Sequence, residues 1–220
     1  MTAIDPRELI VKRVARELKD GHVVNLGIGL PTQVAKHLPD DVRIVLQSEN
    51  GFVGLGNPPA PGEEDMDIVN AGGQPVSINP GGAFFDSAMS FAIIRGGHVD
   101  ATVLGGLQVD EEGNLANWAT PGKVFGMGGA MDLVVGAKRV IVAMEHRTRD
   151  GKPKVLKKCT LPLTAAKEVD LLVTDMGVIE FTPDGLVLRE VAPGMTVDDV
   201  IAATEAALIV PDDVGAMQIS

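Results

Sequence analysis

A carboxylate follows a short apolar run at a point where the chain must turn. Residues 42–46 are apolar and partly β-branched, which predicts a buried strand. Glu49 comes directly after this strand and Ser48, and it precedes Asn50-Gly51, a strong turn dipeptide. Open α/β sheets bind ligands beyond the carboxyl ends of their strands, so a substrate could reach Glu49 there.

Two interpretations of Glu49 follow from the local pattern. Charged residues are mostly exposed, so a solvated turn glutamate is the more common case. A carboxylate at a strand end can also act as a nucleophile that forms a covalent intermediate. The local pattern does not decide between these two interpretations.

Two glycine-rich turns could bind anionic groups through their backbone N–H groups. Gly27 and Gly29 lie between a predicted strand at 22–26 and a short helix ending near His37. This turn lacks the third glycine of a dinucleotide fingerprint, so a purely structural turn fits it equally well. The second turn, at 126–129, precedes a predicted short helix at 131–137 and could hold an oxyanion.

Two other reactive side chains have simpler interpretations. His146 follows a predicted strand and could act as a base, but a satisfied hydrogen-bonding role is more common, since histidine is often partly buried. Cys159 has no neighbouring base, so we expect a small buried residue there rather than a nucleophile.

The pattern of elements predicts an α/β fold, with an open, mainly parallel or mixed sheet flanked by helices. Expectations also follow for one long loop and for two phenylalanines. The irregular loop at 54–65 is expected to form a wall of the active-site cleft, and Phe84 and Phe85 are expected in the core. Helices are expected at 5–21, 86–95, 131–137 and 196–207, and strands at 22–26, 101–104, 139–144, 171–174, 178–181 and 186–190, with a strand pair across 67–78 and a hairpin across 105–118.

Composition limits the class of protein. The chain has 220 residues and is expected to form one domain, 1–220. Its net charge is −11 with no basic stripe, which argues against nucleic-acid binding. It has a single cysteine, no secretory signal and no apolar run long enough for a membrane span, so we expect a cytoplasmic protein without a membrane segment.

The nine residues 46–54, Leu-Gln-Ser-Glu-Asn-Gly-Phe-Val-Gly, resemble the glutamate signature of the class I coenzyme A transferases. The resemblance is to the β chains of the 3-oxoacid type, which includes succinyl-CoA and acetate:acetoacetate CoA-transferases. It extends to residues 25–31, 79–87 and 105–132, and it covers nearly the whole chain. It implies the fold of that class.

The resemblance also implies roles for particular residues. Glu49 would be the catalytic nucleophile of a ping-pong reaction through a glutamyl-CoA thioester. Oxyanion or substrate contacts would come from Gly129, Ala130 and Asn117. Contacts to CoA or the cleft backbone would come from Asn25, Gly27, Gly29, Asn50 and Gly51. Coenzyme A would be substrate and covalent intermediate, with no permanently bound cofactor and no metal.

A partner is implied as well, because the joined form of this family has another half that contributes to the active site. We therefore expect an α subunit in an α2β2 assembly, acting on acyl-CoA and small carboxylic acids in ketone body metabolism. The sequence does not choose among succinate, acetate, butyrate and 3-oxoadipate. Two alternatives remain: a CoA-ester hydrolase on the same scaffold, and a non-catalytic anion-binding subunit.

Overall fold

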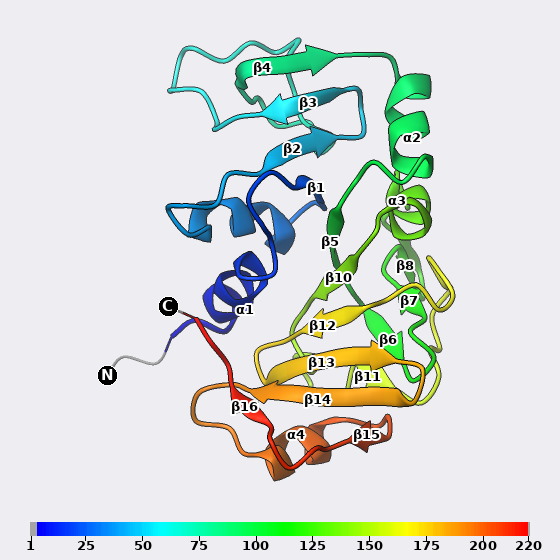
Figure 1. Ribbon diagram of the computed structural model, residues 1–220. Coiled ribbons are helices and arrows are strands. Elements are labelled where there is room, and N and C mark those ends of the chain that lie inside the picture. The colour runs from blue at the N-terminus through cyan, green and yellow to red at the C-terminus, as the bar shows by residue number, and fades with distance from the viewer. Residues whose placement is uncertain (1–3, 220) are drawn as a thin grey trace.

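The computed structural model describes residues 4–219. Within this range, helices separate runs of strands along the chain (Figure 1). In chain order they are α1 (Pro6–Ala15), β1 (Val23–Leu26), the 3-10 helix η1 (Leu30–His37), β2 (Val45–Ser48), β3 (Phe52–Leu55), β4 (Ile78–Phe84), α2 (Ser87–Arg95), β5 (Ala101–Gly105), β6 (Gln108–Asp110), β7 (Leu115–Ala116), β8 (Ala119–Thr120), β9 (Lys123–Val124), α3 (Ala130–Gly136), β10 (Val140–Ala143), β11 (Val155–Leu156), β12 (Leu171–Val173), β13 (Gly177–Thr182), β14 (Gly185–Val191), α4 (Val197–Ala203), β15 (Leu208–Ile209) and β16 (Gly215–Ala216).

The main sheet is mixed, and within the described residues it contains 11 strands. Strands β2, β1, β5, β10 and β12 are neighbours and run parallel. Antiparallel pairs extend the sheet on both sides, with β3 and β4 beyond β2 and with β13 and β14 beyond β12. Figure 1 shows β4 and β14 toward opposite ends of this sheet. The predicted α/β class with a mixed sheet is confirmed.

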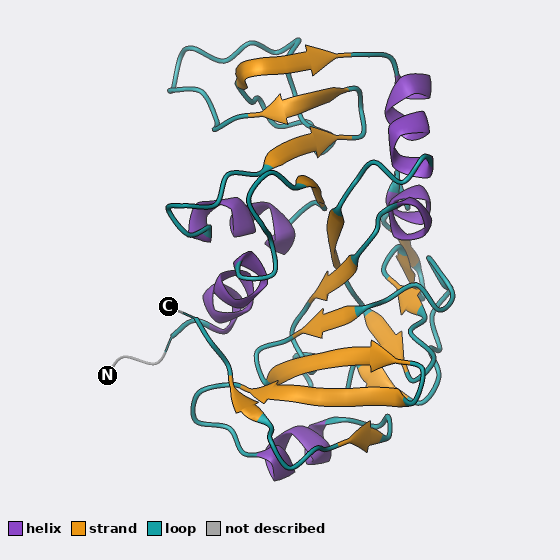
Figure 2. Cartoon of the chain, viewed as in Figure 1, coloured by secondary structure: helices purple, strands orange, loops and turns teal. Residues whose placement is uncertain are grey.

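Helices cover both faces of the parallel strands. Figure 2 shows α1 and η1 on one side, and α2 and α3 on the other. Alternating side chains of each strand serve the two faces, because successive Cβ atoms of a strand point in opposite directions. Ile141 therefore packs in the core beneath α1, whereas Val142 packs in the core beneath α2 and α3.

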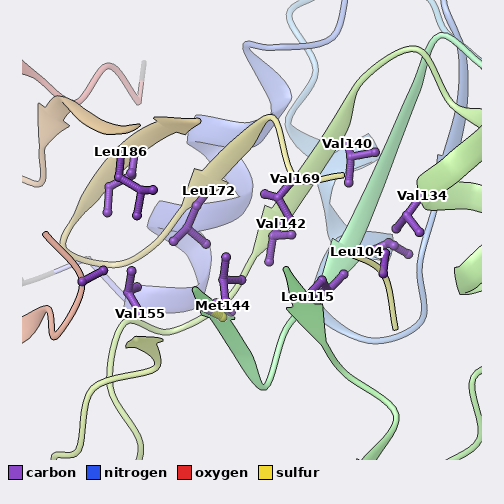
Figure 3. Packing of buried hydrophobic residues seen from close by; sticks show 14 of the residues in the cluster. Leu104, Leu115, Val134, Val140, Val142, Met144, Val155, Val169, Leu172 and Leu186 are labelled. Atoms are coloured by element: carbon purple, nitrogen blue, oxygen red, sulfur yellow. The ribbon is translucent and has the colours of Figure 1, made fainter. Parts of the chain in front are cut away.

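The core on the α2–α3 side is the larger one, and it continues under the small sheet of β11, β6 and β7. Figure 3 shows Leu104, Val142 and Leu172 facing Leu115 and Val155 of that small sheet. This packing fixes the small sheet, which carries Asn117 just after β7, against the parallel strands.

One row of buried polar side chains crosses the parallel strands near β1. Asn25 of β1 is in register with Gln47 of β2 and with Thr102 of β5, so the three side chains occupy one face of three adjacent strands. All three are buried. Burying polar groups costs free energy unless they form hydrogen bonds. The hydrogen-bond partners of this row therefore indicate what the row does.

The strand before Glu49 differs from its prediction. The apolar run 42–46 was expected to be buried, but β2 begins only at Val45, whose side chain is 41% exposed. The buried residues of β2 are the polar Gln47 and Ser48. Ile44 and Leu46 pack against the core beneath α1 but are only partly buried, so the run does not form the fully buried strand that was predicted.

Phe84 also contradicts its prediction. It was expected in the core, but it lies at the end of β4 and is 62% exposed; Phe85 beside it is half-buried. Strand β4 was itself not predicted, because its residues include Pro80, Gly81 and Gly82, which normally disfavour strands.

Other boundaries differ by less. Helix α1 ends at Ala15, and α4 ends at Ala203, so both are shorter than predicted. The strand pair expected across 67–78 is reduced to a single bridge between Val69 and Pro75. The remaining predicted helices and strands are present within a few residues of their expected limits.

Candidate active site

Glu49 occupies the first turn position after β2, at the carboxyl end of a parallel strand. Its side chain is half-buried, and Oε2 accepts a hydrogen bond of 3.0 Å from Nδ2 of Asn25. Among the described residues, no cation forms an ion pair with Glu49, and its Oε1 accepts no hydrogen bond. The carboxylate is thus held at one oxygen and available at the other.

A chain of buried amides stands behind this contact. The Nδ2 group of Asn25 also donates to Oε1 of Gln47 at 2.7 Å, and Nε2 of Gln47 donates to Oγ of Ser90 at 3.0 Å. Ser90 belongs to α2 and is fully buried. The chain therefore connects Glu49 to two strands and a helix. The Gln47 amide has a defined orientation because its oxygen accepts from Asn25 and its nitrogen donates to Ser90.

Two buried oxygens in the same row have no partner within the described part of the chain: Oδ1 of Asn25 and Oγ1 of Thr102. These residues are neighbours in the β1–β5 register. An unsatisfied buried polar atom costs about 1–3 kcal/mol. Unsatisfied buried groups of this kind are typical of functional sites. Here the burial of Asn25 places its Nδ2 group against the Glu49 carboxylate.

Gly129 lies directly against Glu49. A Cβ atom at position 129 would be 3.1 Å from Cγ of Glu49 and 3.3 Å from Cζ of Phe91. Gly129 is buried and stands just before α3, and Phe91 comes from α2. The absence of a side chain at 129 is what lets the α3 backbone approach the carboxylate this closely.

The predicted oxyanion donors differ in their availability. The Gly129 N–H makes no backbone hydrogen bond to any of residues 4–219, whereas the Ala130 N–H donates to the carbonyl of Met127 at 3.0 Å. Ala130 is therefore already engaged. Of the two N–H groups, the geometry favours Gly129.

The turn after Glu49 is rigidly tied. Ser48 Oγ donates to Oδ1 of Asn50 at 2.6 Å and accepts from the Ala71 N–H at 3.2 Å. Gly51 has φ of 134°, and a Cβ there would overlap the carbonyl oxygen of Phe85. Only glycine fits this position, which fixes the direction in which the chain leaves Glu49.

Gly27 and Gly29 lie at the carboxyl end of β1, beside β5. The Gly27 N–H donates to the Val103 carbonyl at 2.8 Å, so it is occupied by the sheet. Gly29 is exposed and has φ of 91°, which permits the sharp turn into η1. No hydrogen bond joins either glycine to Glu49 within the described residues.

Asn117 is not brought to Glu49 by any hydrogen bond among residues 4–219. Its Nδ2 donates to the Gly105 carbonyl at 3.1 Å, and its Oδ1 accepts from Oγ1 of Thr164 at 2.6 Å. Gly105 ends β5, so Asn117 lies over the carboxyl edge of the same parallel strands. Asn117 therefore lies at the same edge of the sheet as Glu49. Both ends of its amide are already hydrogen-bonded, to Gly105 and to Thr164.

His146 and Cys159 are not part of this site. His146 is fully buried between the hydroxyls of Thr174 and Thr204, each 2.9 Å from a ring nitrogen, and burial lowers its pKa to about 4. Burial also raises the pKa of the Cys159 thiol to about 12, with the charge of Asp110 adding to the effect. A thiol of that pKa is a poor nucleophile at neutral pH.

The chain matches the Coenzyme A transferase family over residues 7–203. It belongs to this family. Among its relatives, the β subunit of an acetate CoA-transferase from Haemophilus influenzae is 59% identical over 218 residues, covering 99% of this chain and 97% of that protein. One subunit of a probable succinyl-CoA:3-ketoacid coenzyme A transferase from Bacillus subtilis is 51% identical over 211 residues, covering 96% and 98%. The predicted resemblance and the enzyme class, a CoA-transferase, are confirmed.

Solved structures agree on the fold. An acyl-CoA transferase from Escherichia coli has a TM-score of 0.78 at 22% identity; this chain is covered to 99% but spans only 44% of that chain. Glutaconate coenzyme A-transferase from Acidaminococcus fermentans gives a TM-score of 0.73 at 19% identity, covering 100% of this chain and 91% of that one. The decarboxylase AibA/AibB shares the fold too, with a TM-score of 0.68 at 23% identity, covering 99% and 90%. The fold alone therefore does not fix the reaction.

Sequence reasoning missed three members of the site: Gln47, Ser90 and Phe91. Gln47 was part of the resembling segment but was given no role, although a polar residue at a strand position facing the core is a signal of a buried network. Ser90 and Phe91 carry no such signal, because only the docking of α2 brings them to β2 and α3.

Residues 4–219 contain neither a metal-binding cluster nor a membrane-spanning helix. No cluster of three or more His, Cys, Asp or Glu side chains is arranged to hold a metal ion. No helix in that range is long and apolar enough to cross a bilayer.

Proposed function

We propose that this chain is the catalytic β subunit of a 3-oxoacid CoA-transferase, which moves CoA between an acyl-CoA and a 3-oxo acid of the acetoacetate type. The observation that supports this most is the placement of Glu49. Its carboxylate stands at the end of β2 with one oxygen on Asn25 and its Cγ against Gly129. A nucleophile and a backbone N–H donor are thus adjacent, as acyl transfer requires.

In the proposed reaction, Oε1 of Glu49 attacks the thioester carbonyl of the donor acyl-CoA. The C–S bond then breaks, giving a mixed anhydride on Glu49 and the CoA thiolate. The thiolate attacks the Glu49 carbonyl and releases the donor acid, which leaves a glutamyl-CoA thioester. The acceptor acid reverses these steps, so CoA is a substrate and a covalent intermediate, and no other cofactor is needed.

Each attack creates a tetrahedral oxyanion, and a well-placed donor for that charge is worth about 3–4 kcal/mol in barrier height. Among residues 4–219, the Gly129 N–H is the donor that lies next to Glu49 without a backbone acceptor. Asn25 plays a different part: it holds Oε2 and so directs Oε1 toward the substrate. Asn117, Asn50 and Gly51 shape the surrounding cleft in this proposal.

A second subunit is part of the proposal. Several relatives are named as one subunit of a larger enzyme, and a mouse mitochondrial succinyl-CoA:3-ketoacid coenzyme A transferase, 49% identical, is covered by this chain over only 42% of its length. We expect an α subunit that completes the cleft in an α2β2 assembly. The single cysteine leaves no internal disulfide, which favours the reducing cytoplasm.

Product analysis tests the reaction class. The chain is purified with its α-type partner and incubated with acetoacetyl-CoA, with and without an acceptor such as acetate or succinate. Transfer predicts a new acyl-CoA that forms only with the acceptor. Free CoA released at the same rate without any acceptor would support the hydrolase alternative instead. Full activity in Glu49→Gln would contradict the nucleophile and favour a non-catalytic, anion-binding role.

A further inference from the structure

Two successive residues of α2 reach the candidate active site in different ways. Ser90 ends the hydrogen-bonded chain that runs to Glu49 through two buried amides. Phe91, the next residue, lies against Gly129 at the start of α3. The first contact concerns the carboxylate, and the second concerns the backbone N–H group that stands beside it. One helix therefore touches both halves of the site.

Gly129 is enclosed by the Glu49 side chain and the Phe91 ring. The three atoms nearest to a Cβ atom placed at position 129 are Cγ of Glu49 at 3.1 Å, and Cζ and Cε1 of Phe91 at 3.3 and 3.4 Å. Carbon atoms pack best at about 3.5–4.0 Å, so these two side chains leave no room for a further carbon between them. Glu49 and the outer edge of the ring therefore meet the same side of the Gly129 backbone.

The turn before α3 fixes the shape of this backbone but not its distance from β2. Gly128 has φ of 49°, and the Ala130 N–H donates to the carbonyl of Met127 at 3.0 Å. Both features are internal to residues 127–130, so the whole turn could move as a unit without disturbing them. The distance between this turn and Glu49 depends instead on side chains from other elements, and the Phe91 ring supplies such a contact.

The ring is itself held in place by both helices. Arg95, one turn further along α2, has its guanidinium carbon 5.4 Å from the centroid of the Phe91 ring. Nε of Arg95 is 2.7 Å from Oδ1 of Asp132, which lies in the first turn of α3. Figure 1 shows α2 and α3 next to each other, and Phe91 also packs against the larger core. Phe91 is therefore a fixed spacer between α2 and the start of α3.

We propose that Phe91 is a positioning residue, which sets the distance between the Gly129 N–H and the Glu49 carboxylate. The inference rests on the proposed transferase function, in which that N–H stabilises the oxyanion formed by attack at or on Glu49. Such a donor acts only within about 2.7–3.1 Å of the oxyanion, and a displacement of about 1 Å can lower the rate about 100-fold. Phe91 acts through Gly129 in this role and takes no part in bond breaking.

Phe91→Leu tests the spacer, because leucine ends at Cδ and lacks the Cε1 and Cζ atoms that meet Gly129. In the complex with the α-type partner, we expect kcat to fall about 10- to 100-fold. The affinity for CoA, measured by calorimetry, should change less than about twofold, since the loss affects alignment rather than binding.

Phe181→Leu is the matched control. It removes the same atoms from a half-buried ring on β13 that packs against the same core. It should lower the urea midpoint of unfolding about as much as Phe91→Leu does, but it should keep kcat within about twofold of the native value. Equal kcat values for the two variants would overturn the positioning role.

A double-mutant cycle with Gly129→Ala gives a readout that a loss of stability alone does not change. In the native background the added Cβ meets both Glu49 and the Phe91 ring. In the Phe91→Leu background the contact with the ring is gone, so the factor by which Gly129→Ala lowers kcat should be at least about threefold smaller. In the Phe181→Leu background that factor should equal the native one. Equal factors in all three backgrounds would contradict the spacer.

The rate of adduct formation on Glu49 separates this inference from the proposed function. After mixing with acetoacetyl-CoA, the native complex should form the CoA adduct, and Phe91→Leu should form the same adduct at least about tenfold more slowly. Equal rates would overturn the role of Phe91 and leave the transferase reaction in place. An active native complex that forms no adduct would overturn both.

Discussion

At the scale of single residues, the site depends on side chains that are distant in sequence. Asn25 reaches Glu49 across 24 positions, and Gln47 reaches Ser90 across 43. Each contact holds one end of an amide, so the direction of the Asn25 N–H toward Glu49 is set by Gln47 and in turn by Ser90. We infer that Gln47 and Ser90 are positioning residues for the carboxylate.

A carboxylate at position 25 should change how activity depends on pH. Asn25→Asp would place a second carboxylate about 3 Å from the first, and neighbouring like charges raise one pKa of the pair. The acid limb of the kcat–pH profile should therefore move to higher pH. The control Asn57→Asp adds the same charge on an exposed loop and should leave the profile in place. An unmoved profile in Asn25→Asp would contradict the contact.

Removing the Ser90 hydroxyl, which ends the hydrogen-bonded chain behind Glu49, should lower kcat. Ser90→Ala leaves the Nε2 group of Gln47 buried without an acceptor, at a cost of about 1–3 kcal/mol. We expect kcat to fall about tenfold with little change in KM for acyl-CoA, because the loss affects alignment rather than binding. Ser87→Ala, at the exposed start of α2, is the matched control. Equal kinetics for the two variants would remove Ser90 from the positioning chain.

At the scale of elements, periodicity in the sequence predicted most of what the structure contains. The helix at 86–95 and the strands of β5, β10, β12 and β13 follow their apolar patterns, because each buries one or both faces. Strand β4 could not be predicted, since its pairing with β3 overrides the local preferences of Pro80 and Gly82. The approach of Gly129 to Glu49 was likewise expected only from family resemblance, because it requires α2 and α3 to be docked.

His146 joins three elements and should make stability depend on pH. It ties the end of β10 to Thr174 after β12 and to Thr204 after α4. In the folded protein it takes up a proton only near its lowered pKa of about 4, whereas an unfolded histidine does so near pH 6.5. Because the unfolded state then binds more protons, the free energy of unfolding should fall as pH decreases from about 6.5 to 4, by up to about 3 kcal/mol.

Urea unfolding of the chain at several pH values measures this effect. His146→Gln should be less stable at neutral pH but should show a flatter dependence between about pH 6.5 and 4. His98→Gln changes an exposed histidine and should keep the slope of the native chain. The same slope in His146→Gln as in the native chain would show that this histidine is not held neutral by burial.

At the scale of the whole molecule, exposed apolar side chains occur at both ends of the sheet, and three of them lie on elements near Glu49. Val45 of β2, Phe84 of β4 and Met89 of α2 are 41%, 62% and 55% exposed. Figure 1 places these elements together at the end of the molecule that carries Glu49 after β2. Large exposed apolar side chains such as these are candidates for a surface that a partner covers. Such a surface also gives a physical reason why Val45 is apolar although it is exposed, while Ile44 and Leu46 on either side of it pack against the core.

Charges introduced on this surface should disrupt assembly. Phe84→Asp and Met89→Asp should release the chain from its α-type partner, which light scattering on the co-purified complex would detect. Ile201→Asp is the control, because Ile201 is 45% exposed on α4 at the opposite end of the sheet. If the first two variants stay in the complex as firmly as Ile201→Asp, the partner binds elsewhere.

The central claim is that Glu49 becomes covalently bonded to CoA. Peptide mass spectrometry on the complex, after incubation with acetoacetyl-CoA, tests it most directly. We predict a CoA thioester, or its borohydride-reduced product, on the peptide that contains Glu49, and no adduct in Glu49→Gln. A native complex that binds CoA and turns over acyl-CoA without any adduct at Glu49 would contradict the mechanism.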